Sequence, residues 1–111
     1  MKHKRTILID LDGVLNEYKG DYDENYIPNI KEGALDFLQD LSQNYELYLF
    51  TTRDIIKAQS WLVEKKIEKF FSGVINQKIP AYLIIDDRCV CFDGNYNSVL
   101  SKIKNFRIWY K

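Results

Sequence analysis

Two pairs of acidic residues follow apolar runs at distant points of the chain. Asp10 and Asp12 lie at the end of the first run, and Asp86 and Asp87 end a second run at residues 82–85. Like charges repel, so carboxylates gathered at the end of a buried strand need a shared proton or cation. The two pairs therefore indicate a site for a divalent cation that prefers oxygen ligands, such as Mg²⁺.

The composition predicts one globular domain over residues 1–111. Hydrophobic residues make up 46% of the chain and charged residues 29%, which is typical of soluble domains. Sixteen basic residues balance sixteen acidic ones, so no net field attracts nucleic acid or an acidic membrane. The apolar run behind the basic start is short and interrupted by acids, so we expect no secretory signal, no membrane span and a cytoplasmic location. Cys89 and Cys91 are expected to pack as small residues in a reduced interior.

Stretches of strand length alternate with stretches of helical spacing. Continuous apolarity is typical of strands that are buried on both faces, as in a parallel sheet. We expect strands at residues 6–11, 45–50, 74–75, 82–85, 89–92 and 106–110. We expect helices at residues 29–41, at 54–71 and from 97 or 98 to 103. This order predicts a single Rossmann-like domain of three layers, α/β/α, with a mainly parallel central sheet and right-handed crossovers.

Capping residues and apolar stripes position the first two helices. Asn29 is expected to cap the first helix, with Glu32 in the capping-box position, and Asp54 is expected to cap the second. An apolar stripe in the first helix is expected to face the core and consists of Ile30, Ala34, Phe37, Leu38 and Leu41. Trp61 and Trp109 are expected in the core or in a subunit contact.

A polar and aromatic flap loop is expected over residues 16–28. A loop of this length in so small a domain is usually functional or mobile. It carries Tyr18, Tyr22 and Tyr26. Either one of these rings stacks on or screens a substrate, or the aromatic side chains anchor the loop on its own domain.

Polar residues follow three of the expected strands. Ligands of open α/β sheets bind outside the carboxyl ends of the strands, so these residues could share one edge of the sheet. They are Asp10, Asp12, Thr51, Thr52, Asp86 and Asp87. Lys78 precedes the fourth strand and could reach this edge only from a loop.

Phosphoryl transfer is the chemistry that needs such a set. Carboxylates from two strands would hold Mg²⁺, which neutralises a phosphate that the acids would otherwise repel. One Asp can then attack phosphorus, while a second acid protonates the leaving alcohol and later activates water. A hydroxyl and an ammonium group would bind the phosphoryl oxygens.

Four motifs of the chain resemble those of the haloacid dehalogenase superfamily. In chain order they are Asp10-Leu11-Asp12-Gly13-Val14-Leu15, Leu47-Tyr48-Leu49-Phe50-Thr51, Lys78, and Leu83-Ile84-Ile85-Asp86-Asp87. They keep the family order and span residues 6–88. The resemblance implies a haloacid-dehalogenase-like hydrolase domain and an Mg²⁺-dependent phosphatase, because the family's phosphatases carry an acid at the position of Asp12.

The resemblance also implies roles for individual residues. Asp10 becomes the nucleophile that forms an aspartyl-phosphate, and Asp12 becomes the general acid and base, with its backbone carbonyl on the metal. Thr51 holds the phosphoryl group, and Lys78 pairs with the phosphate and Asp10, unless Lys78 is a solvated loop residue. Asp86 binds the metal, with Asp87 beside it or bound through water.

Four residues that follow the motifs leave alternatives open. In a straight strand only one of Thr51 and Thr52 can face the site, and we favour Thr51. Arg53 either contacts a substrate group or balances the acids through a salt bridge. The same two alternatives apply to Arg88, which follows the acidic pair.

Neither the flap loop nor residues 53–77 have room for a cap domain, so the chain resembles the capless type of the family. In that type an open site admits a large or macromolecular phosphorylated substrate, or an oligomer partner covers it. We therefore expect a small-molecule or macromolecular phosphate ester as substrate, a possible homo-oligomer, and no nucleic-acid partner.

A phosphatase is the first prediction, and a nucleotidase or a sugar-phosphate phosphatase is a narrower version of it. A receiver-like signalling domain uses similar residues in another order, because its acidic pair comes first. A catalytically weak protein of the same fold, with a binding or regulatory role, is a third alternative. The intact Asp10 and Asp12 argue against it.

Overall fold

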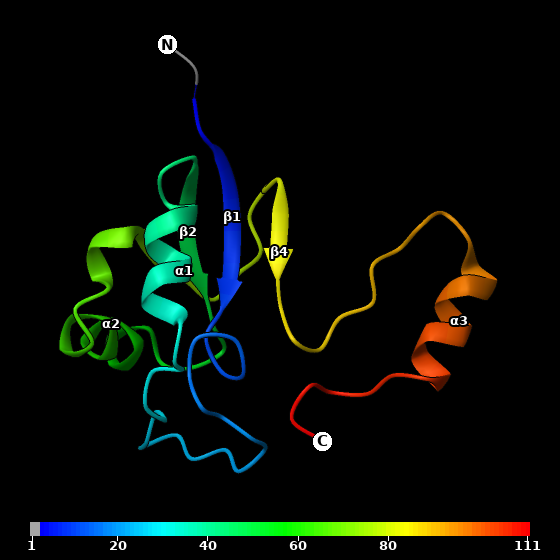
Figure 1. Cartoon of the computed structure of the whole chain (residues 1–111), viewed down its shortest axis with the longest axis horizontal. Helices are drawn as coiled ribbons and strands as arrows, with labels where there is room; N and C mark the ends of the chain where they lie inside the picture. The colour runs from blue at the N-terminus through cyan, green and yellow to red at the C-terminus, as the bar shows by residue number, and fades with distance from the viewer. Residues whose placement is uncertain (1–2) are drawn as a thin grey trace.

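The computed structural model describes residues 3–111 and there contains four parallel strands and three α-helices (Figure 1). The strands are β1 (Arg5–Asp10), β2 (Tyr45–Phe50), β3 (Phe71–Ile75) and β4 (Leu83–Ile85). The helices are α1 (Ala34–Leu41), α2 (Ile55–Glu64) and α3 (Tyr96–Lys104), and a 3₁₀ turn, η1 (Glu68–Phe70), precedes β3. The strand order is β3-β2-β1-β4, with every neighbouring pair parallel. The predicted single Rossmann-like α/β domain with a parallel sheet is confirmed.

One face of the sheet carries the core. Ile7 and Ile9 of β1 stand in register with Leu47 and Leu49 of β2. They form one buried cluster with side chains from α1 and α2, namely Ala34, Leu38, Ala58, Trp61 and Leu62. The chain passes from β1 to β2 to β3 in one direction across the sheet, so right-handed crossovers place both helices on this face.

The opposite face has no helical layer within residues 3–111. It carries Leu8, Tyr48 and Ile84 in register across three strands, and the Tyr48 ring lies over Gly73. All buried helical side chains of residues 3–111 belong to the cluster on the first face. The connection over residues 76–82 is too short for a helix, and α3 stands beyond β4 (Figure 1). Of the two predicted helical layers, the one on this face does not form.

Helix α1 starts later than the sequence predicts. Gly33, at a φ of 90°, precedes its first residue, Ala34. Asn29 does not cap the helix, because its side chain accepts a hydrogen bond from the neighbouring Ile30 amide. Ile30 itself forms an isolated antiparallel bridge with the start of the flap loop. Phe37 is exposed, so the prediction that it faces the core is wrong.

Helix α2 begins as predicted, since the Asp54 side chain accepts a hydrogen bond from the Lys57 amide. It ends at Glu64, and Phe71, which the sequence places at the end of the helix, begins β3. None of the helices in the described part of the chain has the length and apolar character needed to cross a bilayer.

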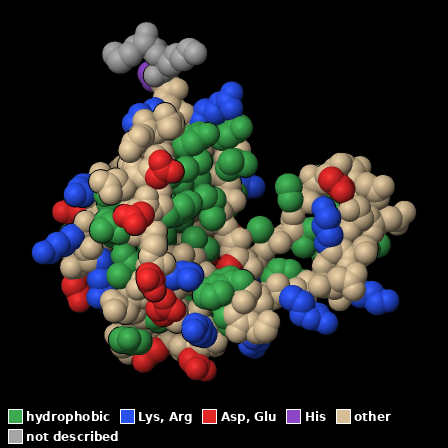
Figure 2. Space-filling model, viewed as in Figure 1, with side chains coloured by type: hydrophobic (Ala, Val, Ile, Leu, Met, Phe, Trp, Pro, Cys, Tyr) green, Lys and Arg blue, Asp and Glu red, His purple; other side chains and the backbone are tan. Residues whose placement is uncertain are grey.

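The predicted strands at residues 89–92 and 106–110 do not form. After β4 the chain leaves the sheet (Figure 1), so neither stretch lies beside a strand with which it could pair. Helix α3 begins at Tyr96, after its cap Asn95. Cys89 and Cys91 are exposed in this segment, so the prediction that they pack in the interior is wrong. Figure 2 shows hydrophobic side chains on the sheet near β4 and a hollow between them and the part that carries α3.

Candidate metal centre and active site

Three carboxylates meet where β1 and β4 end. Asp10 is the last residue of β1, and Asp86 and Asp87 directly follow β4. Because β1 and β4 are parallel neighbours, their carboxyl ends lie at the same edge of the sheet. One carboxylate oxygen from each of the three residues lies within 4.8 Å of the other two. The structure therefore brings together three of the four acids that the sequence assigns to a metal.

The electrostatics of this cluster disfavour three free negative charges. Burial, followed by repulsion from Asp86 and Asp87, raises the pKa of Asp10 to about 7. Burial, followed by repulsion from Asp86, also raises the pKa of Asp87. The Oδ2 atom of Asp87 is buried and has no hydrogen-bond partner within residues 3–111. An unpaired buried carboxylate oxygen beside two further carboxylates fits a hard divalent cation such as Mg²⁺.

A glycine is needed at position 13 for two reasons, the positive φ of its turn and the close approach of Asp87. Its φ is +85°, and a Cβ at this position would overlap the carboxylate of Asp87. Its carbonyl accepts a 2.7 Å hydrogen bond from the Trp109 indole Nε1. Trp109 is half-exposed and holds this loop beside the site, so the prediction that it packs in the core is wrong, and the alternative of a subunit contact stays a prediction.

We predict that Gly13→Ala destabilises the protein more than Gly33→Ala does. Gly33 has a similar φ of +90°, but a Cβ there meets nothing within 4 Å. Each variant carries the strain of positive φ, about 1–3 kcal/mol, and only Gly13→Ala must also displace Asp87. Urea unfolding and Mg²⁺ titration of both variants measure the difference. Equal losses of stability with unchanged Mg²⁺ affinity would contradict the prediction.

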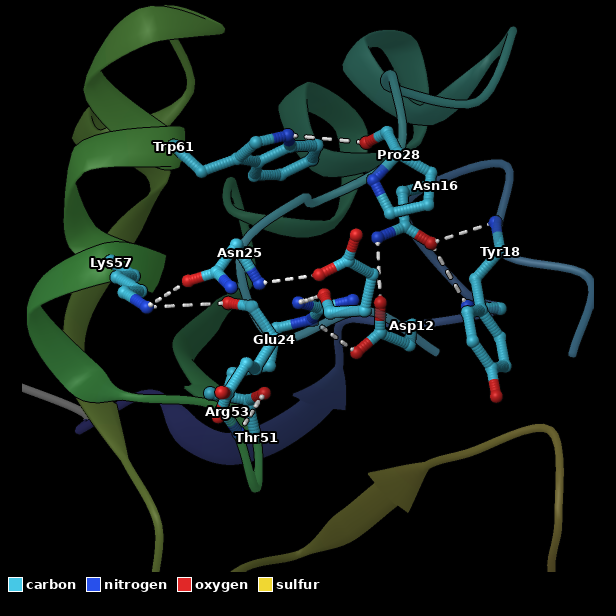
Figure 3. Close-up of polar contacts among 12 residues, drawn as sticks. Asp12, Asn16, Tyr18, Glu24, Asn25, Pro28, Thr51, Arg53, Lys57 and Trp61 are labelled. Atoms are coloured by element: carbon cyan, nitrogen blue, oxygen red, sulfur yellow. Dashed lines mark hydrogen bonds and ion pairs between the residues drawn. The ribbon is translucent and has the colours of Figure 1, made fainter. Parts of the chain in front are cut away.

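Asp12 is bound by two partners of its own, Arg53 and Asn16 (Figure 3). Its Oδ2 accepts a 2.7 Å hydrogen bond from Arg53 Nε, and its Oδ1 accepts a 3.0 Å bond from Asn16 Nδ2. Its carboxylate is not part of the group that could hold a metal. A contact between the Asp12 backbone carbonyl and the metal stays a prediction.

Arg53 connects Asp12 to the flap loop. Its side chain is buried, and Nη1 donates a 2.9 Å hydrogen bond to the Asp23 carbonyl. The guanidinium carbon lies 4.7 Å from the centroid of the Tyr22 ring. Nη2 is buried without a partner in the described part of the chain. Of the two alternatives for Arg53, the structure contains the salt bridge.

Asn16 is a buried site residue that the sequence analysis did not single out. Its Oδ1 accepts hydrogen bonds from the amides of Gly13, at 3.1 Å, and Tyr18, at 3.0 Å, while its Nδ2 binds Asp12. It is fully buried. A single Asn directly after an apolar turn is the signal that could have found it, since Asn side chains often bind backbone amides at turns.

Thr51 and Thr52 lie after β2, and only the first is buried. The Thr51 hydroxyl accepts a 3.1 Å hydrogen bond from the Arg53 amide, and the Thr51 amide donates to the Ile75 carbonyl. Lys78 is exposed in the connection between β3 and β4. It forms no ion pair within residues 3–111. The structure does not bring Lys78 to the acids.

Much of the flap loop is anchored on its own domain. The Tyr18 ring meets the Tyr110 ring edge-on at 6.4 Å, and Tyr22 lies over Arg53. The Lys57 ammonium donates to the Glu24 carbonyl, and the Trp61 indole donates to the Pro28 carbonyl (Figure 3). These contacts are what the anchoring alternative predicts for the tyrosines. Tyr26 is exposed and is the flap tyrosine most open to a substrate.

Arg88, directly after the acidic pair, contacts the C-terminal segment. Its Nη2 donates a 2.7 Å hydrogen bond to the Tyr110 hydroxyl. This hydrogen bond is the largest of the effects that raise the pKa of Arg88. The side chain therefore holds the end of the chain beside the site.

We predict that the metal-free protein loses stability as the pH rises from about 4 to about 7. The pKa of Asp10 is about 7 in the folded state and near its ordinary 3.8 when unfolded, so the folded state holds the extra proton over this window. Thermal unfolding in EDTA between pH 4 and pH 8 measures the effect. Mg²⁺ should stabilise the protein more at pH 8 than at pH 5, because it competes with that proton. A profile unchanged by Asp10→Asn would contradict the prediction.

Comparison with known proteins supports the fold alone. No protein-family model matches the chain, and no curated protein is significantly similar to it. A solved structure of a conserved protein from Bacteroides thetaiotaomicron is similar to it, with a TM-score of 0.63 and 24% sequence identity. The match covers 92% of this chain and 91% of that one. The class that fold and site define is a Rossmann-like α/β domain with an acidic cluster at the carboxyl edge of its sheet.

Proposed function

We propose that the protein is an Mg²⁺-dependent phosphatase that hydrolyses a phosphate monoester through an aspartyl-phosphate on Asp10. The convergence of the Asp10, Asp86 and Asp87 carboxylates is the observation that carries this proposal. The order of the motifs, which resembles the haloacid dehalogenase superfamily, supports it. Bound at the three carboxylates, Mg²⁺ would neutralise their repulsion and the charge of the phosphoryl group.

The chain's own residues then carry the two half-reactions. A carboxylate oxygen of Asp10 attacks phosphorus, the ester P–O bond breaks, and the leaving alkoxide takes a proton from Asp12. In the second half, Asp12 takes a proton from water, which attacks the aspartyl-phosphate and releases inorganic phosphate. Asp10 returns as a free carboxylate.

Polar groups around the cluster would bind the phosphoryl oxygens. Thr51, Thr52 and Arg53 follow β2, the parallel neighbour of β1, and are the candidates, whereas Lys78 would have to move from its exposed loop to join them. An oxygen-rich, uncapped site suits a phosphorylated small molecule or macromolecule. We also place the protein in the cytoplasm, where exposed Cys89 and Cys91 would stay reduced.

The bonds of Asp12 favour a second candidate function. Both of its carboxylate oxygens are occupied, by Arg53 and by Asn16. For proton transfer, one of these bonds must open when substrate binds. If neither opens, the chain is a cation-binding protein of the same fold that holds phosphorylated ligands without hydrolysing them.

The test is hydrolysis of an aryl phosphate by the purified protein, with Mg²⁺ and with EDTA. Nucleotides, sugar phosphates and phosphopeptides extend the panel to substrate classes. We expect turnover that requires Mg²⁺. Binding of Mg²⁺ by calorimetry without turnover on any substrate would favour the binding protein, and turnover that is unaffected by EDTA would contradict both.

A further inference from the structure

Residues 89–107, called the arm below, leave the domain after β4, form α3 and return to it. Both ends of the arm are fixed beside the acidic cluster, where Arg88 binds Tyr110, Trp109 binds the Gly13 carbonyl and Ile108 is buried. Between these ends, no residue of α3, all of which is described, is buried. Figure 1 shows α3 standing clear of the sheet.

Helix α3 has the residue pattern of a helix that packs against another surface. Tyr96, Leu100 and Ile103 recur at i, i+4 and i+7, so they share one face. They are 79%, 64% and 59% exposed. A helix of nine residues is marginal in water on its own. We therefore expect the apolar face of α3 to pack against another surface.

The apolar surface around β4 matches this helix in character. β4 is an outer strand of the sheet and has no neighbour on its far side within residues 3–111. Leu83 is 51% exposed on the core face, Ile84 is 37% exposed on the opposite face, and Tyr82, just before the strand, is half-exposed, so these side chains flank the open edge of β4. Figure 2 shows hydrophobic side chains gathered on this part of the sheet, across the hollow from α3. An exposed apolar edge strand favours association unless it is covered.

We propose that two copies of the chain exchange arms, so that α3 of each copy packs on the β4 surface of the other. Every copy carries both the uncovered helix and the uncovered strand, so a two-fold dimer covers both surfaces and leaves neither open. Within one chain, the fixed ends of the arm hold α3 away from its own β4. This proposal does not depend on the catalytic one.

The area available is sufficient for a stable dimer. The exposed fractions of five arm side chains add up to the surface of about three complete side chains. At roughly 150 Å² for each complete side chain, this is on the order of 450 Å². These side chains are Phe92, Tyr96, Leu100, Ile103 and Phe106. The β4 surface adds on the order of 200 Å² by the same measure. Complete burial of all these side chains in a reciprocal exchange would remove about 1,300 Å² in total from water, which reaches the range of specific interfaces.

The first experiment compares two neighbouring residues of α3. Leu100 lies on the apolar face, and Ser101 lies about 100° further around the helix. Sedimentation of the full chain should give twice its 13.2 kDa mass. Leu100→Asp should weaken dimerisation by about 100-fold or more, whereas the matched Ser101→Asp should leave it unchanged. A wild-type monomer up to near-millimolar concentration, or equal behaviour of the two variants, would overturn the proposal.

The second experiment identifies which copy supplies the helix. Leu83→Cys and Leu100→Cys are combined in a chain that also carries Cys89→Ser and Cys91→Ser. Oxidation should give a covalent dimer on a non-reducing gel, and neither single cysteine variant should give it to the same extent. A bridge formed within one chain would mean that α3 folds back on its own sheet. Either that result or a dimer without any bridge would overturn the exchange.

Discussion

Asp10→Asn is expected to lower Mg²⁺-dependent phosphate-ester hydrolysis by on the order of 10³-fold or more, because an amide cannot attack phosphorus. The substitution keeps the size of the side chain and removes its charge. The structure gives a reason to expect that it leaves the fold intact. Burial and repulsion from Asp86 already disfavour the charged form of Asp10, so the neutral side chain should be at least as stable in metal-free protein.

Two measurements make this prediction specific. The matched control is Asp40→Asn, which makes the same chemical change at an exposed position of α1 and should keep full activity. Mass spectrometry of wild type quenched during turnover should show the addition of one phosphoryl group, and Asp10→Asn should show none. Activity of Asp10→Asn within a few-fold of wild type would mean that another residue is the nucleophile.

Arg53→Met is expected to lower the free energy of unfolding by about 2–4 kcal/mol, because it leaves the Asp12 carboxylate without its buried partner. Asp12 is partly exposed, with a side-chain accessibility of 17%, so the loss should fall short of that for a fully buried pair. The substitution also frees Asp23 and Tyr22 from their contacts with the guanidinium. Urea unfolding measures the loss of stability.

The effect of Arg53 on catalysis can be separated from its effect on stability. Arg53→Lys keeps the positive charge but cannot bind Asp12 and the Asp23 carbonyl with one planar group. If Arg53 positions Asp12, kcat should fall by about 10²-fold in this variant, with a smaller change in KM. Arg107→Met, at an exposed arginine, is the control and should change neither quantity. A change in KM alone would indicate that Arg53 binds substrate directly.

The sequence predicted the acidic cluster because the placement of Asp10 and Asp86 follows from local rules. Each residue comes at the end of an apolar run, and parallel strands put such ends at one edge of a sheet. The same reasoning could not place Lys78, whose position depends on the path of a connection without regular structure. It also failed for residues 89–92 and 106–110, since their apolar character suits a strand but no strand edge lies beside them.

The contacts around Asp12 could be predicted only in part, because the sequence offered a salt bridge from Arg53 to the acids without indicating which acid it binds. Trp109 reaches Gly13 across 96 positions of the sequence, and Arg53 reaches Asp12 across 41. Neither spacing has a periodicity that a single sequence reveals. Asn16 was within reach, because its partners are at most four residues away. The sequence analysis placed Asn16 only at the start of the flap loop and gave it no role, although it is fully buried.

The close approach of Gly13 to Asp87 has a consequence for the evolution of this chain. A side chain at position 13 overlaps the Asp87 carboxylate, so position 13 cannot gain a side chain while Asp87 stays as it is. An Asn at position 13, which tolerates the left-handed backbone, becomes acceptable only after position 87 has shortened, for example to Ser. We therefore expect substitutions of Gly13 only in related proteins that have already lost Asp87.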